Sequence, residues 1–140
     1  MLKTDIIQKA IVRKEDGKVL ILRRSNTDTR RPLQWDLPGG FLDDNEELIE
    51  GIEREVKEEA GIQVKQTHLI YSQTEHRKWD GGEANAVFLI YSTIANKEEV
   101  KLSFEHNDYK WVDLSEILNI FEYKTHLDII NYIIDNQLAL

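Results

Sequence analysis

Residues 40–62 have the sequence GFLDDNEELIEGIEREVKEEAGI. From about residue 46 to residue 60, apolar residues recur at helical spacing, so one side of a helix there is apolar. Gly61 follows the last of them and is typical of the left-handed residue that ends a helix. The segment therefore predicts an amphipathic helix between two loops, with an apolar side made of Leu48, Ile49, Ile52, Val56 and Ala60.

Acidic residues crowd the same segment. Residues 43–59 hold nine acids and two bases, a local charge of −7 against −8 for the whole chain. Glu55, Glu58 and Glu59 fall within roughly a 100° arc beside the apolar side, and Gly51 lies on that arc. Such carboxylates repel one another and favour a hard cation, Mg2+ or Mn2+ rather than zinc. A solvated acidic helix face and a structural Ca2+ site are the alternative interpretations.

The spacing of this segment resembles the signature of the Nudix hydrolases, and no position of that signature is missing. Seven fixed letters at about 7% each would match a given start by chance on the order of once in 10^8. The resemblance implies an α/β/α sandwich, a fold of the α/β class with a mixed β-sheet between helices. It rests on Gly40, Glu46, Arg54-Glu55-Val56, Glu58-Glu59 and Gly61-Ile62.

The rest of the chain predicts further strands and helices. Strands are expected at 6–12, 19–22, 63–74, 84–93 and 109–112, a polar loop at 25–34, and a turn at 80–82. A short helix is expected at 114–118, and a second long amphipathic helix at 125–138. With 140 residues the chain is long enough for one well-buried domain, so we predict a single domain over 1–140.

Composition narrows the class of protein. Because there is no cysteine, the chain has no disulfide, zinc-thiolate site or cysteine nucleophile, which fits a reducing cytoplasm. A pI near 5.0 disfavours non-specific binding to nucleic acid. The apolar runs are too short for a membrane span. We expect a cytoplasmic protein with a small-molecule nucleotide substrate, no nucleic-acid or membrane partner, and a monomeric or homodimeric state.

The Nudix resemblance also implies a reaction. It implies a metal-dependent pyrophosphohydrolase that cleaves the diphosphate linkage between a nucleoside diphosphate and another moiety. The cofactor implied is Mg2+, with Mn2+ as an alternative. The substrate classes left open are nucleoside triphosphates, nucleotide sugars, ADP-ribose and dinucleoside polyphosphates. The chain lacks the proline and tyrosine markers of the last two classes, which makes both less favoured.

Residue roles follow from the same resemblance, position by position. The metal ligands implied are Gly40 through its carbonyl, Glu55, Glu58, Glu59, and Glu105, which lies six residues before Trp111. The catalytic set implied is Glu55, Glu58, Arg54 and Glu46. In that set Arg54 and Glu46 pair to hold the glutamates in place, and Glu55 is either a ligand or the general base.

Residues outside the segment are candidates for substrate binding. They are Arg23, Arg24, Trp35 and Tyr123, and strand alternation points the two arginines to opposite faces, so that one of them can bind. Residues 76–79 (HRKW) form a basic, aromatic hairpin tip that could hold a phosphate and a ring, or could be a solvated loop. His68, His106 and His126 form no recognisable constellation.

Three rival functions can be weighed. A non-catalytic, nucleotide-sensing Nudix-fold regulatory domain would commonly lack some of the glutamates, and this chain has all of them. An isoprenoid diphosphate isomerase would need a cysteine. An enzyme that removes RNA caps would usually need a basic surface, which a net charge of −8 disfavours. The regulatory domain is the main alternative.

Overall fold

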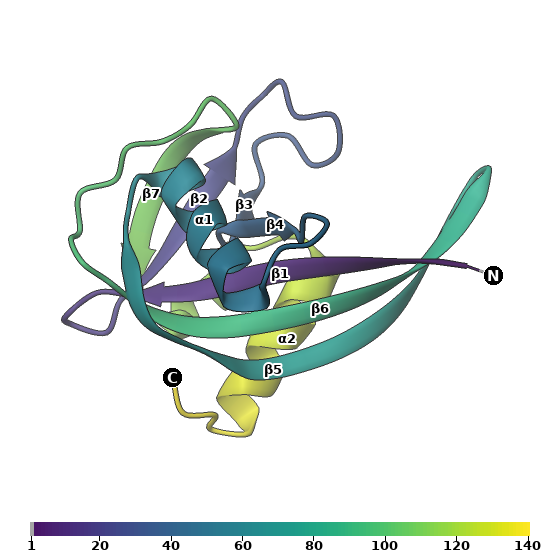
Figure 1. Ribbon diagram of the computed structural model, residues 1–140. Helices are drawn as coiled ribbons and strands as arrows, with labels where there is room; N and C mark the ends of the chain where they lie inside the picture. The colour runs from purple at the N-terminus through teal and green to yellow at the C-terminus, as the bar shows by residue number, and fades with distance from the viewer. Residues whose placement is uncertain (1) are drawn as a thin grey trace.

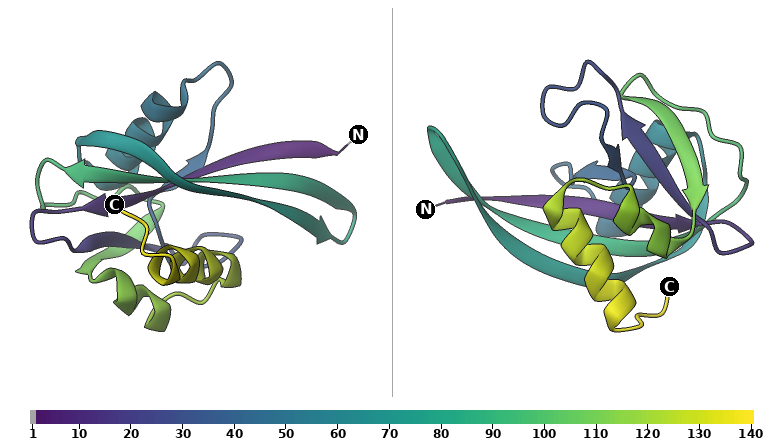
Figure 2. Two further views of the ribbon diagram at one scale, coloured as in Figure 1. Left: turned by 90° about the horizontal axis from the view of Figure 1, so that it is seen from below. Right: turned by 180° about the vertical axis from the view of Figure 1, so that it is seen from behind.

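The protein is built around a mixed β-sheet with helices on both faces. The computed structural model describes residues 2–140. Helix α1 covers one face of the sheet, and η1 and α2 cover the other, so the predicted α/β/α sandwich is confirmed (Figures 1 and 2). In chain order the elements are β1 Lys3–Arg13, β2 Val19–Arg24, β3 Trp35–Asp36, β4 Gly39–Phe41, α1 Leu48–Ala60, β5 Val64–Trp79, β6 Gly82–Ala95, β7 His106–Val112, the 3-10 helix η1 Leu114–Asn119 and α2 Lys124–Asp135.

Strand β1 lies at the centre and changes its partner along its length. The strand order is β3-β2-β1-β6-β5, with β4 also pairing with β1 and β7 with β2. The β1–β6 pair is parallel and the other pairs are antiparallel. Next to their turn, β1 meets β2 at Arg13↔Val19, whereas in mid-strand it meets β4 at Lys9↔Gly39. This change brings the Gly39-Gly40 pair against the middle of β1.

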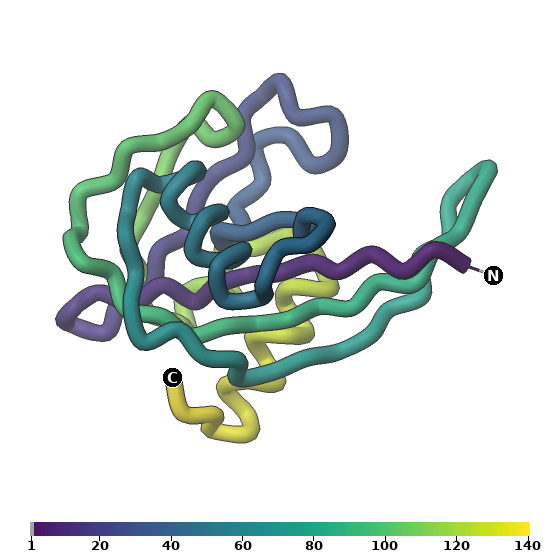
Figure 3. Tube along the Cα trace, in the orientation of Figure 1, coloured from purple at the N-terminus to yellow at the C-terminus, as the bar shows by residue number. Residues whose placement is uncertain are grey.

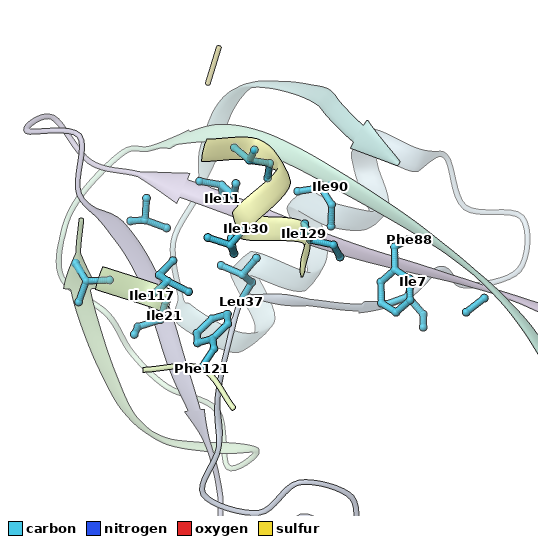
Figure 4. Close-up of a cluster of buried hydrophobic side chains, with 14 residues drawn as sticks. Ile7, Ile11, Ile21, Leu37, Phe88, Ile90, Ile117, Phe121, Ile129 and Ile130 are labelled. Atoms are coloured by element: carbon cyan, nitrogen blue, oxygen red, sulfur yellow. The ribbon is translucent and has the colours of Figure 1, made fainter. Parts of the chain in front are cut away.

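Strand alternation divides the core into two layers. Odd-numbered residues of β1 and β2, such as Ile7, Ile11 and Ile21, pack with α2 and η1 (Figure 4). Even-numbered residues, such as Val12 and Leu20, pack with the apolar side of α1. Each helix is thus fixed to one face of the sheet by its own buried layer.

Helix α1 begins and ends for local reasons. Gly61 adopts φ 69°, and its N–H donates to Lys57 O at 2.9 Å, which confirms the predicted end. The helix begins at Leu48, two residues later than predicted. The predicted apolar side was too wide, because Leu48 and Ile49 are 41% and 40% exposed. Gly51 leaves room for a loop, since an added Cβ would lie 2.9 Å from Glu46 Oε1.

The hairpin of β5 and β6 is longer than the sequence suggested. Its strands pair as far as Trp79↔Gly82, so residues 76–79 belong to β5 and the turn is confined to Asp80 and Gly81. The hairpin extends past the layered body, next to the N-terminal end of β1 (Figure 3). By contrast, α2 ends at Asp135, three residues before the predicted end, and β7 begins at His106, three residues before the predicted start.

Within residues 2–140, no helix combines the length and the apolar character needed to cross a bilayer.

Candidate active site

A single arginine of α1 gathers four acidic side chains. Arg54 donates to both carboxylate oxygens of Glu46, at 2.6 and 3.0 Å, and to Glu55 and Glu58 at 3.2 and 3.0 Å. Its Nη2 also lies 3.3 Å from Asp43 Oδ2. The hydrogen bonds from Arg54 hold the pKa of Glu46 below its usual value. We call these five residues the Arg54 cluster.

The other acids of α1 face the Gly39-Gly40 turn. Glu59 is buried, and its Oε1 accepts a hydrogen bond of 2.8 Å from the Gly39 N–H. Gly39 has φ 142°, and an added Cβ would lie 2.0 Å from Gln8 O, so only glycine fits there. At Gly40 an added Cβ would lie 3.0 Å from Glu55 Oε1. The two glycines therefore allow the chain to pass close to both carboxylates.

Burial perturbs both of these carboxylates. It raises the pKa of Glu59 to about 8, with the charges of Glu55 and Asp36 adding to the effect and that of Lys9 opposing it. Burial also raises the pKa of Glu55, against the pull of Arg54. Two neighbouring carboxylates that resist ionisation form a place where a cation would be stabilised.

The donor set at this place fits a hard divalent ion. Glu55 and Glu59 lie one helical turn apart beside the Gly40 backbone, and all the atoms they offer are oxygens. Glu58, by contrast, is 60% exposed and engaged by Arg54. Within residues 2–140, no three acidic or histidine side chains already converge as a metal cluster. Glu55 and Glu59 therefore offer suitable ligand atoms beside Gly40, while the third carboxylate, that of Glu58, lies at the surface.

A pocket of about 210 Å3 opens beside Glu59 and Gly40. Five cationic side chains line it, drawn from β1, β2, the 25–34 loop and β5: Lys9, Arg24, Arg30, Arg31 and Arg77. Three guanidinium nitrogens there are buried and have no hydrogen-bond partner among residues 2–140, namely Arg24 Nε, Arg31 Nη1 and Arg77 Nε. The cationic lining of the pocket suits an anionic or acceptor-rich ligand.

A buried aspartate organises these cations. Asp36 is fully buried, and its Oδ2 lies 3.2 Å from Lys9 Nζ, 3.1 Å from Arg24 Nη1 and 3.4 Å from Arg31 Nη2. Its Oδ1 lies 3.1 Å from His126 Nδ1. Burial alone would raise the pKa of Asp36, but its neighbours Lys9, His126 and Arg31 hold it well below its usual value. We call these five residues the Asp36 cluster.

The structure brings in residues that local spacing did not identify. His106 and His126 both line the pocket, and burial lowers the pKa of His106 to about 4 and also that of His126. They come from β7 and α2, so no local spacing could connect them. Lys9 did carry a signal, because a lysine amid the apolar residues of β1 must find a buried partner.

The candidate substrate residues separate into two groups. Arg24 and Tyr123 line the pocket, as does the exposed Glu105, which was predicted as a metal ligand. Arg31 Cζ lies 4.1 Å from the centre of the Tyr123 ring. Arg23 instead donates to Asn107 Oδ1 at 2.8 Å, and its Cζ lies 5.8 Å from the centre of the Trp35 ring. Of the two arginines, Arg24 therefore lines the pocket and Arg23 does not, and the β2–β7 register shifts between them.

Comparisons with known proteins identify the family of the chain. The family model described as the NUDIX domain matches residues 6–132. The nucleoside triphosphatase NudI of Escherichia coli is 30% identical over 111 residues, covering 74% of this chain and 79% of NudI.

Solved structures give the same result. The MutT protein of Methanosarcina mazei superimposes with a TM-score of 0.78 at 28% identity, covering 97% of this chain and 96% of that one. An Ap4A hydrolase of C. elegans superimposes with a TM-score of 0.66 at 25% identity, covering 91% and 93%. The matched domain spans the Arg54 cluster, the Gly39-Gly40 turn and the pocket, and we conclude that the chain belongs to the NUDIX family and is a Nudix hydrolase.

Proposed function

We propose that the protein is a Mg2+-dependent pyrophosphohydrolase, able to use Mn2+, that cleaves the diphosphate linkage of a nucleoside diphosphate derivative. The observation that carries this proposal is the position of Glu55 beside Gly40 and of Glu59 at the edge of a cationic pocket. Acids there suit a metal ion, and the cations next to them suit phosphates. We place the protein in the cytoplasm, as a monomer or homodimer.

The residues of α1 would hold the ion and position the reacting groups. Glu55, Glu59 and the Gly40 carbonyl are the nearest ligands, with Glu58 and Glu105 completing the set. The ion, when bound, supplies charge neutralisation at the phosphate oxygens and a water of lowered pKa. Glu55 or Glu58 accepts the proton of the attacking water.

Other residues position these glutamates and bind the substrate. The fork of Arg54, fixed by Glu46, holds Glu55 and Glu58 in place as a positioning group. Arg24 and Tyr123 of the pocket contact the substrate.

The substrate we propose is a small nucleotide rather than nucleic acid. Guanidinium groups line the pocket and match phosphate oxygens, and the Tyr123 ring lies beside Arg31. The names of two similar proteins, a nucleoside triphosphatase and an Ap4A hydrolase, indicate which classes of nucleotide to test. Nucleoside triphosphates and dinucleoside polyphosphates are therefore the first compounds to assay.

The test is product release from a substrate panel with Mg2+ or Mn2+. The panel holds dNTPs, ADP-ribose, nucleotide sugars and diadenosine polyphosphates. We expect turnover of one class well above the others, lost by at least about 100-fold in Glu59→Gln and in Glu55→Gln. The matched control is Glu50→Gln, which alters an exposed acid in the first turn of the same helix and should keep full activity.

Two outcomes would overturn the proposal. Metal-dependent turnover that survives Glu55→Gln and Glu59→Gln would remove these residues from the reaction. Tight nucleotide binding without turnover of any compound would favour a nucleotide-sensing regulatory domain instead.

A further inference from the structure

Strand alternation places two residues of the hairpin tip on the pocket side of the sheet. Along β5, Tyr71 stacks on Tyr132 of α2 with ring centres 4.6 Å apart, and Glu75 accepts a hydrogen bond of 3.0 Å from Thr125. Arg77 and Trp79 continue this odd-numbered row past the start of α2. His76 and Lys78 belong to the opposite face, so the four tip residues do not act together.

The indole of Trp79 is held in place but remains half open to solvent. It lies over Gly82, where an added Cβ would be 2.8 Å from Trp79 Cζ2. Its exposure is 55%, and that of Phe41 on β4 is 45%. Both rings line one groove. A single exposed ring is common on protein surfaces, whereas two rings from separate elements that line the same groove indicate a binding surface.

Cations accompany the two rings. Arg30 and Arg77 line the same groove, with Arg30 Cζ 5.8 Å from the centre of the Phe41 ring. Neither arginine forms an ion pair within residues 2–140, and the one acid of the groove, Asp5, is paired with Lys3 at 3.3 Å. Flat apolar surfaces beside unneutralised guanidinium groups match a planar ring attached to a phosphate.

The groove continues from the main pocket. Arg30, Phe41 and Arg77 line both spaces. The main pocket encloses about 210 Å3, below the ~300–1,000 Å3 typical of small-molecule sites, and the groove adds about 330 Å3. A nucleotide whose diphosphate lies at Glu59 therefore needs more room than the pocket provides, and the groove is the adjoining space.

We propose that the groove between Phe41 and Trp79 is a stacking site for the nucleobase of the substrate. Arg77, which borders both spaces, contacts the phosphate chain that joins this ring to the bond that is cleaved. This proposal rests on the proposed function, because it assumes that the diphosphate lies at Glu59. It assigns Trp79, at the far end of the hairpin, to substrate binding.

Steady-state kinetics of Trp79→Ala and Trp79→Phe test the assignment on whichever nucleotide the enzyme hydrolyses. We expect Trp79→Ala to raise KM about tenfold with kcat nearly unchanged, because base stacking is lost, and Trp79→Phe to keep most of the affinity. The inhibition constant of inorganic pyrophosphate, which has no ring, should be the same in all variants. Lys78→Ala, on the opposite face of β5, is the matched control and should behave as wild type.

A second measurement does not depend on turnover. A nucleoside monophosphate should quench the fluorescence of the wild-type protein more than that of Trp79→Phe, and ribose 5-phosphate should quench neither. Quenching without hydrolysis would support the stacking site while overturning the proposed function. Hydrolysis with an unchanged KM in Trp79→Ala and no difference in quenching would overturn the stacking site alone, as would an equal change for pyrophosphate.

Discussion

The Arg54 cluster and the Asp36 cluster are built in opposite ways. In the first, one cation is surrounded by four acids, all from residues 43–58. In the second, one acid is surrounded by Lys9, Arg24, Arg31 and His126, from β1, β2, the following loop and α2. The Arg54 side chain is 29% exposed and the Asp36 side chain 1% exposed.

This difference predicts that one cluster contributes mainly to the stability of the fold and the other mainly to catalysis. Charges near solvent gain little from pairing, so the Arg54 cluster can orient carboxylates without contributing much to folding. Buried charges depend on their partners, since each would be costly to leave alone. The Asp36 cluster should therefore hold the pocket together, and the Arg54 cluster should act mainly on turnover.

The largest expected effect comes from removing the central charge of the buried cluster. Asp36→Asn leaves Lys9 and Arg31 without an anion and Arg24 with Asp28 alone. We expect a loss of about 3–5 kcal/mol in the free energy of unfolding, measured by urea denaturation. The control Asp128→Asn breaks an exposed pair with Lys124 and should cost at most about 0.5 kcal/mol. A loss below about 1 kcal/mol in Asp36→Asn would mean that the cluster does not support the fold.

The second effect is a dependence of stability on pH through Glu59. Its pKa is raised to about 8 in the folded protein, so its contribution to stability is fully present below about pH 4.5 and is lost as the pH rises through 8. Without metal, Glu59→Gln should therefore gain stability over wild type as the pH rises from 5 to 9, on the order of a few kcal/mol. Added Mg2+ should stabilise wild type more at pH 9 than at pH 6. A difference between the two proteins that stays constant with pH would contradict this.

The smallest effect on stability should come from the exposed cluster. Arg54→Lys keeps the charge but loses the fork that binds Glu46 at two oxygens. We expect turnover to fall by about 10- to 100-fold while the free energy of unfolding changes by less than about 1 kcal/mol. Lys57→Gln, on the same helix, serves as the control for kcat and melting temperature. A loss of stability in Arg54→Lys as large as the one expected for Asp36→Asn would contradict the proposed difference between the clusters.

The parts of the fold that the sequence predicted are those with local causes. The spacing of Ile52, Val56 and Ala60 and the stop at Gly61 placed α1 to within two residues of its observed start. The extension of β5 to Trp79 was missed, because its polar tip is held by pairing with β6 and not by a buried apolar face. Strands β3 and β4 were missed because they are two and three residues long.

The sequence by itself determined the acidic end of the site. Arg54, Glu55 and Glu59 lie on one helix and Glu46 lies just before it, so their spacing along the chain sets which side chains meet. Only the tertiary structure decided the cationic pocket. Asp36, Lys9 and His126 are far apart in the chain and meet because β1 exchanges β2 for β4 in mid-strand and α2 packs across the sheet. Local spacing encodes neighbours along a helix, whereas contacts between distant segments depend on which surfaces pack together.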